Sequence, residues 1–236
     1  MSVLAVTGTG TEVGKTIVTA AIAALCPDVV TVLKPAQTGL RLEEPGDVDV
    51  VKSLVPHVET LELVRYPEPL APATAARRSG IPTLTAAEVA EGVEEADADL
   101  VLLEGAGGLL VRLSDDPVLT FADVLVELSA PAVLVTTAGL GTLNHTALTL
   151  EAMRTRGIEL AGVVIGAWPW EPDLASLTNL EDLQTLIDGP IAGVLPGGIG
   201  NLPPEQFADV ASRGLSPRFG GQFEADRFVT QAKGLL

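Results

Sequence analysis

The glycine-rich segment from Gly8 to Thr16, GTGTEVGKT, holds the residues whose types and spacing most clearly indicate chemistry. An apolar run precedes it and a helical pattern follows, so we expect it to join a strand to a helix. Its glycines allow a tight turn whose N–H groups point at a phosphate, and the positive end of the helix adds to that field. In such a loop Lys15 reaches the terminal phosphates and the Thr16 hydroxyl binds Mg²⁺. The segment therefore predicts a nucleoside triphosphate site.

The spacing of this loop is one residue longer than usual. The common pattern has four residues between its first glycine and Gly-Lys-Thr, which would require glycine at Thr9. Counted from Gly8, the gap is five residues. The alternative is a glycine-rich turn that binds no ligand. Gly-Lys-Thr at the expected strand-to-helix junction favours a phosphate loop, and the longer gap indicates a particular branch of that superfamily.

Other non-repetitive segments also follow predicted strands. KPAQTG begins at Lys34, EGAGG at Glu104, GLGTLNH at Gly139, GAW at Gly166 and LPGG at Leu195. Ligands of open α/β sheets bind outside the carboxyl ends of the strands. We therefore expect these segments to meet in one crevice with the phosphate loop.

Several charged side chains of these segments suit phosphoryl transfer. Glu104 ends an apolar run and could hold Mg²⁺ opposite Thr16, or end its strand in solvent. Lys34 could neutralise a transferring phosphoryl group, or be a surface lysine. Asp47 and Asp49 could be acids in the first turn of a short helix, and Asp49 is an equal candidate for a second Mg²⁺ carboxylate.

The elements that must position these residues alternate between strand and helix. This order predicts one α/β domain over residues 1–236, with a parallel sheet and helices on both faces. The predicted strands cover 3–7, 29–34, 99–104, 131–137, 160–167 and 190–195. The predicted helices cover 15–25, 48–55, 85–96, 119–129, 143–156 and 174–187. The proline-rich stretch 66–82 is expected to be a loop or an irregular crossover, and the tail from 201 has no clear pattern beyond helical turns.

Composition excludes some classes of function. The chain has 31 acidic and 14 basic residues, a formal net charge of −17, and no cluster of Lys and Arg larger than Arg77-Arg78. This balance argues against nucleic acid and anionic membranes as partners. The apolar runs are too short to span a membrane, so we expect a cytoplasmic protein. Cys26, His57 and His145 are interpreted as structural.

Taken together, the motifs resemble those of the ATP-dependent dethiobiotin synthetase family, within the P-loop NTPase superfamily. The similarity extends from Val6 to about Pro196. It rests on four ordered matches: the long phosphate loop, Lys34-Pro35-x-x-Thr38-Gly39, Glu104 to Gly108, and Gly141 to His145.

The resemblance implies a ligase of biotin biosynthesis. The substrates would be 7,8-diaminopelargonate, CO₂ and a nucleoside triphosphate, with Mg²⁺ as the metal. One amine would take up CO₂ as a carbamate, whose oxygen attacks the γ-phosphate to give a carbamic–phosphoric anhydride. The second amine would then close the ureido ring and release phosphate.

The resemblance also implies roles for individual residues. Lys15 and Lys34 would be catalytic, and Mg²⁺ would be held by Thr16, Asp49 and Glu104. The nucleotide would contact Thr9, Gly10, Thr11, Glu12, Val13, Gly14, Lys15, Thr16, Ile17, Ala167, Val194, Leu195 and Pro196. The diamine or its carbamate would contact Thr11, Lys15, Lys34, Thr38, Gly108, Leu143 and Asn144. The helix start at Leu143 and Asn144 would receive the substrate carboxylate from the neighbouring subunit of a homodimer.

The sequence departs from the family pattern at two places. Gly10 stands where many members carry Asp, and the segment Gly166-Ala167-Trp168 lacks the Asn that reads adenine in many members. Base contacts would then come from the backbone near Ala167 and Val194 to Pro196. ATP is the expected nucleotide, but another triphosphate such as CTP is an open alternative.

Two other classes share parts of this pattern. A ParA/MinD-like ATPase switch shares the architecture, but it usually carries an extra lysine early in the phosphate loop, and it needs a basic DNA-binding face or a membrane helix. An amidoligase of the cobyrinate type needs a glutaminase domain with a nucleophilic cysteine. The synthetase family explains more of the sequence than either alternative.

Overall fold

The computed structural model describes residues 1–235 and centres on a sheet of seven strands. Their spatial order is β3-β2-β4-β1-β7-β8-β9, and all neighbouring pairs run parallel. The strands are β1 (Ser2–Gly8), β2 (Val30–Thr38), β3 (Glu59–Tyr66), β4 (Leu100–Glu104), β7 (Ala132–Thr136), β8 (Leu160–Trp168) and β9 (Gly193–Pro196). The carboxyl ends of β1, β2, β4 and β8 therefore lie at one edge, as the predicted crevice requires.

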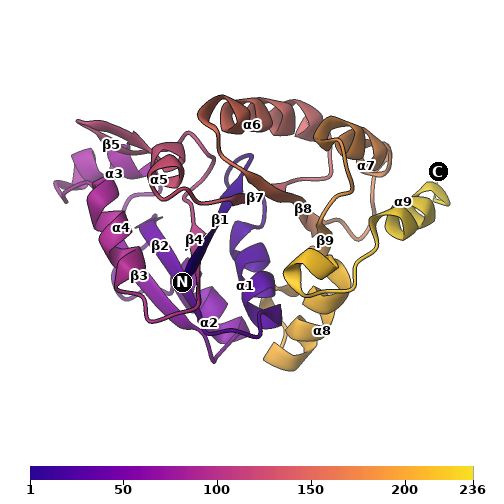
Figure 1. Ribbon diagram of the computed structural model, residues 1–236, viewed down its shortest axis with the longest axis horizontal. Helices are drawn as coiled ribbons and strands as arrows, with labels where there is room; N and C mark the ends of the chain where they lie inside the picture. Colours follow the sequence, from indigo (N-terminus) through magenta and orange to yellow (C-terminus); the bar gives the residue numbers. More distant parts are fainter. Residues whose placement is uncertain (236) are drawn as a thin grey trace.

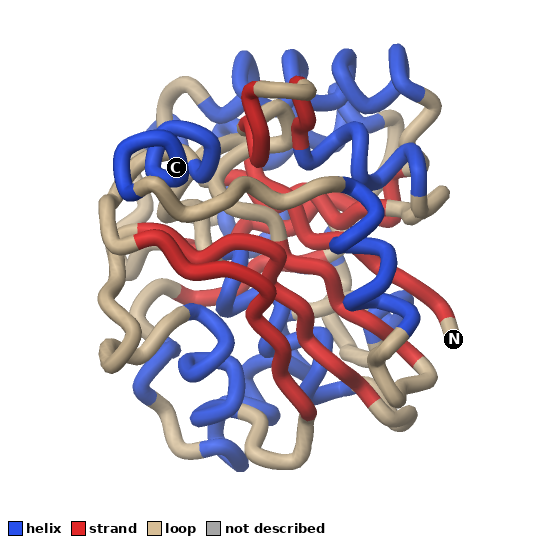
Figure 2. The backbone as a smooth tube through the Cα atoms, turned by 90° about the vertical axis from the view of Figure 1, so that its left-hand side faces the viewer, coloured by secondary structure: helices blue, strands red, loops and turns tan. Residues whose placement is uncertain are grey.

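Helices cover both faces of this sheet (Figures 1 and 2). One face packs against α1 (Lys15–Leu25), α2 (Asp47–Leu54) and α8 (Pro204–Gly214). The opposite face packs against α3 (Pro72–Ser79), α4 (Ala86–Glu94), α5 (Phe121–Glu127) and α6 (Thr142–Arg156). A third cluster joins α7 (Leu174–Ile187) and α9 (Ala225–Lys233) to the β8–β9 end. The predicted fold class is confirmed.

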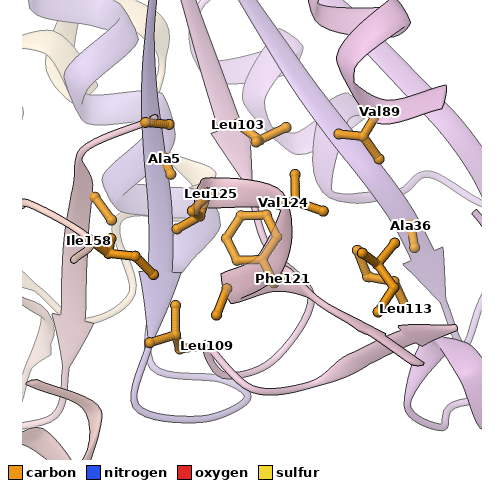
Figure 3. Packing of buried hydrophobic residues seen from close by; sticks show 14 of the residues in the cluster. Ala5, Ala36, Val89, Leu103, Leu109, Leu113, Phe121, Val124, Leu125 and Ile158 are labelled. Carbon is orange, nitrogen blue, oxygen red and sulfur yellow. The ribbon is translucent and has the colours of Figure 1, made fainter. Parts of the chain in front are cut away.

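Alternating strand residues supply the two main cores. Ala5 and Leu103 belong to the cluster on one face, whereas Val6 and Leu102 belong to the cluster on the other. Successive side chains of a strand point to opposite faces, so a strand covered on both sides must be apolar throughout. Figure 3 shows the ring of Phe121 packed in the first of these clusters. These cores fix the strand ends that carry the polar residues.

The structure corrects the predicted loop over residues 66–82. Helix α3 spans Pro72–Ser79 inside it. Pro72 is at the start of the helix, where the missing N–H is no loss and the fixed φ suits helical backbone. The strand β3 and the antiparallel hairpin β5 (Arg112–Asp115) and β6 (Val118–Thr120) were not predicted either. The tail contains α8 and α9 with the short 3₁₀ helices η1 (Ile199–Asn201) and η2 (Pro217–Phe219).

The second strand is longer than predicted, and Lys34 lies inside it rather than at its end. Its pairing with β4 ends at Leu33 opposite Leu103. Beyond that point β2 pairs with β3 as far as Thr38 opposite Tyr66. Pro35 has no backbone N–H to donate to a neighbouring strand. It is tolerated because β4 no longer pairs with β2 at this position.

Within residues 1–235, none of the helices is long and apolar enough to cross a membrane.

Candidate active site

The loop between β1 and α1 closes against strand β8. Gly14 precedes α1 with a φ of 96°, in the left-handed region that favours glycine. A Cβ at Gly14 would lie 2.6 Å from the carbonyl oxygen of Gly166, so only glycine fits the contact. Among the described residues no side chain caps the start of α1, and its first turn contains no acid. The N-terminal N–H groups of α1 are therefore open to an anion.

Lys15 begins α1 and is buried, with 7% of its surface exposed. Its Nζ donates to the carbonyl oxygen of Gly10 across the loop (2.9 Å). Burial, followed by the positive charge of Lys34, lowers the pKa of Lys15 from 10.5 to about 8. A bound anion strongly stabilises the charged form of such a buried ammonium, because the anion replaces the hydration lost on burial.

Lys34 forms a buried charge network with two acids. Its Nζ donates to Oε1 of Glu104 (2.8 Å) and to the carbonyl oxygen of Gly105 (3.3 Å), and lies 2.5 Å from Oδ2 of Asp47. Burial opposes the charge of Lys34, but attraction to Glu104 and Asp47 outweighs it and raises the pKa. Lys34 therefore stays charged throughout the pH range in which enzymes usually work.

Thr16 and Glu104 meet, as the sequence predicts for neighbouring metal ligands. The hydroxyl of Thr16 donates to Oε1 of Glu104 (2.9 Å), the same oxygen that accepts from Lys34. Glu104 is 1% exposed, which excludes the alternative of a solvated carboxylate at the strand end. One carboxylate thus joins the phosphate loop to strand β2.

Asp47, and not Asp49, brings a second carboxylate to this cluster. Asp49 accepts from the N–H of Gly46 (2.7 Å) and lies 3.8 Å from Arg65, with its side chain 54% exposed. It therefore serves the start of α2, the alternative that the sequence left open. Asp47 and Asp49 are two residues apart on a helix, and side chains at that spacing do not share a face. Only the fold shows which of the two faces Lys34.

A cleft of about 380 Å³ contains these groups. Both lysines, Thr16, Glu104 and Asp47 line it. The other lining residues are Thr11, Glu12, Gly14, Ile17, Ala36, Gln37, Thr38, Ala106 and Gly107. Gln37, like Thr38, was a candidate for polar contacts to a substrate. Ala36, Ala106 and Gly107 were not among the predicted site residues, although they stand in the two motifs that the sequence placed at the crevice. Such small residues carry no chemical signal by themselves.

A second cavity adjoins the other side of the phosphate loop. It is lined by Gly8, Thr9, Gly10, Thr11, Gly108, Leu109, Leu110, Val111, Leu148, Thr149 and Ala152. Thr11 lines both cavities, and the predicted substrate residue Gly108 lies close to the loop, because a Cβ there would be 3.3 Å from the oxygen of Gly8. This cavity joins the phosphate loop to helix α6 and is largely apolar.

Threonine hydroxyls link the phosphate loop to the start of α6. The Thr136 hydroxyl lies 2.7 Å from that of Thr142, 2.9 Å from that of Thr146 and 3.4 Å from that of Thr9. Leu143 packs against the third core cluster and Asn144 is exposed, so both lie at the helix start without lining either cavity. Their predicted role at a subunit interface stays a prediction.

The residues predicted near the base lie beside the loop, beyond Gly166. Ala167 is exposed at the end of β8, and Trp168 pairs with Pro196 of β9. Val194 and Leu195 are buried, with Leu195 in the core against α1 and α8. Val13 is buried too, in the core cluster that includes α1, α2 and α8. None of these residues is in the lining of the cleft, and their predicted contacts with the base stay a prediction.

The oxygen donors of the cleft fit Mg²⁺. The hydroxyl of Thr16 and the carboxylates of Glu104 and Asp47 are hard oxygen donors gathered at the phosphate loop. Within residues 1–235, no group of three His, Cys, Asp or Glu side chains is arranged to hold a metal without help. Mg²⁺ is commonly held by one or two carboxylates together with substrate phosphates, which is what this cleft offers.

Comparison with solved structures assigns the fold to a class. The septum site-determining protein MinD of Pyrococcus horikoshii, complexed with Mg-ADP, is 14% identical with a TM-score of 0.55, covering 99% of this chain and 95% of its own. Apo McdA of Cyanothece is 13% identical with a TM-score of 0.59, covering 99% and 100%. At these identities the likeness concerns the fold alone. Fold and site together define a P-loop nucleotide-binding α/β protein.

Sequence comparison is more specific. A family model described as an AAA domain matches residues 2–199. The ATP-dependent dethiobiotin synthetase BioD of Saccharopolyspora erythraea is 58% identical over 94% of this chain and 99% of its own length. The enzyme of the same name from Streptomyces avermitilis is 54% identical over 98% of both. The chain belongs to the ATP-dependent dethiobiotin synthetase family, which are ligases of biotin biosynthesis.

Proposed function

We propose that this chain joins 7,8-diaminopelargonate and CO₂ into the ureido ring of dethiobiotin at the expense of a nucleoside triphosphate. The main observation in support of this proposal is the content of one cleft at the phosphate loop. It is lined by Lys15, Lys34, Thr16, Glu104 and Asp47. The reaction needs charge neutralisation around a phosphoryl group, and no covalent catalyst. A cleft with two buried cations and a hard-oxygen cluster suits that requirement.

The two lysines have separate roles in this proposal. Lys15 would leave its contact with Gly10 and bind the β- and γ-phosphates, beside the N–H groups at the start of α1. Lys34, held by its acids, would face the carbamate oxygen that attacks the γ-phosphate. Both charges would then stabilise the negative charge spread over the transferring group. Thr38, at the end of β2, would contact the carbamate or its amine.

The metal end of the cleft is proposed for Thr16, Glu104 and Asp47. These three residues would hold Mg²⁺, which would supply positive charge against the negative charge of the nucleotide phosphates. The sequence assigned Asp49 to this set, and the geometry supports Asp47 in its place. Thr16 would turn its hydroxyl proton away from the metal, and Lys34 would hold the carboxylate of Glu104 in place.

The cavity between the phosphate loop and α6 supports a site for the aliphatic part of the diamine. It is lined by Leu109, Val111 and Leu148 and opens beside Thr11, which also faces the first cleft. The carboxylate of the substrate would reach the N-terminus of α6 of a second subunit, at Leu143 and Asn144. A homodimer is thus part of the proposal, supported by the exposed side chains of Leu140 (93%) and Leu148 (57%).

A product assay tests the proposed reaction. The protein is incubated with 7,8-diaminopelargonate, ¹³C-bicarbonate and Mg²⁺, with ATP, CTP or GTP in separate tubes, and the products are measured by mass spectrometry. We expect a labelled cyclic urea and an equal amount of phosphate. The relative rates define the nucleotide, for which ATP is our expectation. Nucleotide hydrolysis without labelled product would contradict the proposal.

A further inference from the structure

The surface loop that precedes α2 is tied down by a single side chain from a neighbouring strand. Arg65 of β3 donates through Nη1 to the carbonyl oxygens of Arg41 (3.0 Å), Leu42 (3.3 Å) and Glu44 (2.5 Å). Side chains 41–45 are exposed, so the loop gains little from burial. Hydrogen bonds to a charged donor are among the strongest that could order it.

Arg65 is itself held rigidly. Its Nε donates to Oε1 of Glu62 (2.6 Å) and its Nη2 to Oε2 of the same carboxylate (2.8 Å). The two side chains are only 11% and 15% exposed. A bidentate pair of this kind fixes the plane of the guanidinium, so its remaining N–H groups point in a set direction. The loop therefore meets a rigid donor.

Gly46 carries this constraint to the catalytic cleft. A Cβ at Gly46 would lie 2.8 Å from Nη2 of Arg65 and 3.1 Å from Oε1 of Gln37. The next residue, Asp47, donates its N–H to that same Gln37 oxygen (3.0 Å), and its carboxylate reaches Lys34 at 2.5 Å. The guanidinium of Arg65 thus packs directly against the backbone of Gly46, the residue before Asp47.

We propose that Arg65 is a positioning residue for phosphoryl transfer, which holds the loop 41–46 so that Asp47 stays against Lys34 at the metal end of the cleft. The inference rests on the proposed role of Asp47. Without the guanidinium, the loop loses its three carbonyl contacts, and Asp47 keeps its own contacts and its place at the start of α2 without support from the loop before it. Small displacements of a charged group around a reacting phosphoryl group are costly.

The test compares Arg65→Met with Arg78→Met. Arg78 pairs with Glu68 on the surface, far from full burial, so its variant is a matched loss of one Arg–Glu pair. Hydrogen exchange of the amides of residues 41–47 is measured in the ligand-free proteins. Affinity for Mn²⁺, used as a probe for Mg²⁺, is measured by electron paramagnetic resonance with a non-hydrolysable ATP analogue. Both readouts are independent of turnover.

For Arg65→Met we expect faster exchange over residues 41–47 and Mn²⁺ affinity lowered by about 10-fold to 100-fold, the range for groups that orient metal ligands. Arg78→Met should match the wild type in both. Arg65→Lys keeps the charge without the fork and should restore little. In the double variant with Asp47→Asn, the Arg65 substitution should add nothing further, because its effect acts through Asp47.

The outcomes separate this inference from the proposed function. Normal Mn²⁺ affinity in Arg65→Met beside a defect in Asp47→Asn would overturn the inference alone, as would additive effects of the two substitutions. Normal Mn²⁺ affinity in Asp47→Asn would overturn both the metal role of Asp47 and the inference. If Arg65→Met does not fold, Glu62→Gln, which frees the guanidinium without removing it, gives the same comparison.

Discussion

Lys15 and Lys34 line the same cleft and are both buried, yet the structure surrounds them in opposite ways. Lys34 contacts two carboxylates, and they raise its pKa despite burial. Lys15 contacts a backbone carbonyl, and burial, followed by the like charge of Lys34, lowers its pKa to about 8. One cation is already neutralised by acids in contact, and the other is uncompensated in the sense that no acid contacts it, since Glu104 and Asp47 attract it only from a distance.

The difference teaches how a single cleft can both hold an anion and orient the group that attacks it. An uncompensated buried charge gains strongly from a ligand phosphate, as a binding group should. A compensated charge is fixed in place by its partners and is preorganised before any ligand arrives. Phosphoryl transfer requires both functions, and the chain divides them between the phosphate loop and strand β2.

The largest effect should follow removal of the uncompensated charge. We expect Lys15→Met to lower kcat/KM by about 10³-fold, because the phosphates lose their main side-chain donor. Stability should rise slightly or stay unchanged, since the variant removes a buried cation that has no acid in contact. Steady-state kinetics and thermal unfolding measure the two effects. Loss of stability together with normal turnover would break the comparison.

Removal of the compensated charge should act on turnover and stability together. We expect Lys34→Met to lower kcat by about 10²-fold, through loss of one preorganised charge at the reacting group. It should also destabilise the fold by about 3–5 kcal/mol, because Glu104 is left buried beside Asp47 without a cation. Denaturant unfolding with Lys15→Met as the control gives the contrast. A stable Lys34 variant with full activity would remove this residue from the mechanism.

Asp47 and Asp49 extend the comparison to two acids that are close in the sequence but have different surroundings. We expect Asp47→Asn to raise the Mg²⁺ concentration that gives half-maximal turnover by about 10-fold to 100-fold, as for a group that binds or orients a metal. Asp49→Asn should stay within about twofold, since Asp49 serves the exposed start of α2. Titration of activity with Mg²⁺ measures both. Equal defects in the two variants would contradict the assignment of Asp47.

The smallest effect concerns protons. Because Lys15 has a pKa of about 8 in the free protein and bound phosphates favour its charged form, nucleotide binding should take up a proton at pH 9 and almost none at pH 7. The nucleotide Kd should rise by about tenfold over that interval. Calorimetry in buffers of different ionisation enthalpy measures the uptake.

Lys15→Arg is the control for this proton linkage, since arginine keeps its charge at pH 9. It should show neither proton uptake nor the rise in Kd. The lowered pKa of Lys15 also makes the stability of the free protein depend on pH. Between pH 8 and 10.5 the unfolded chain holds more protons on Lys15 than the folded one. This group therefore makes the free protein more stable as pH rises through that range. A fall caused by Lys15 would contradict its lowered pKa.

The sequence was sufficient to predict those features that depend on residues close together in the chain. The phosphate loop predicted its own strand, turn and helix, and continuous apolar runs predicted the central strands. The strand ends also predicted that Lys34 and Glu104 would meet in one crevice. Strand β3 was missed because its partly polar pattern has no continuous apolar run, and α3 was missed because prolines at its start suggested a loop.

The amino-acid sequence by itself determined the phosphate loop, the alternation of strands and helices, and the family. Only the tertiary structure decided that Asp47 rather than Asp49 faces Lys34, and that Arg65 holds the loop between them. The reason is physical. Residue type and period fix a backbone that is stabilised by near neighbours, whereas ion pairs across 13 to 70 residues depend on how two strands and a loop pack.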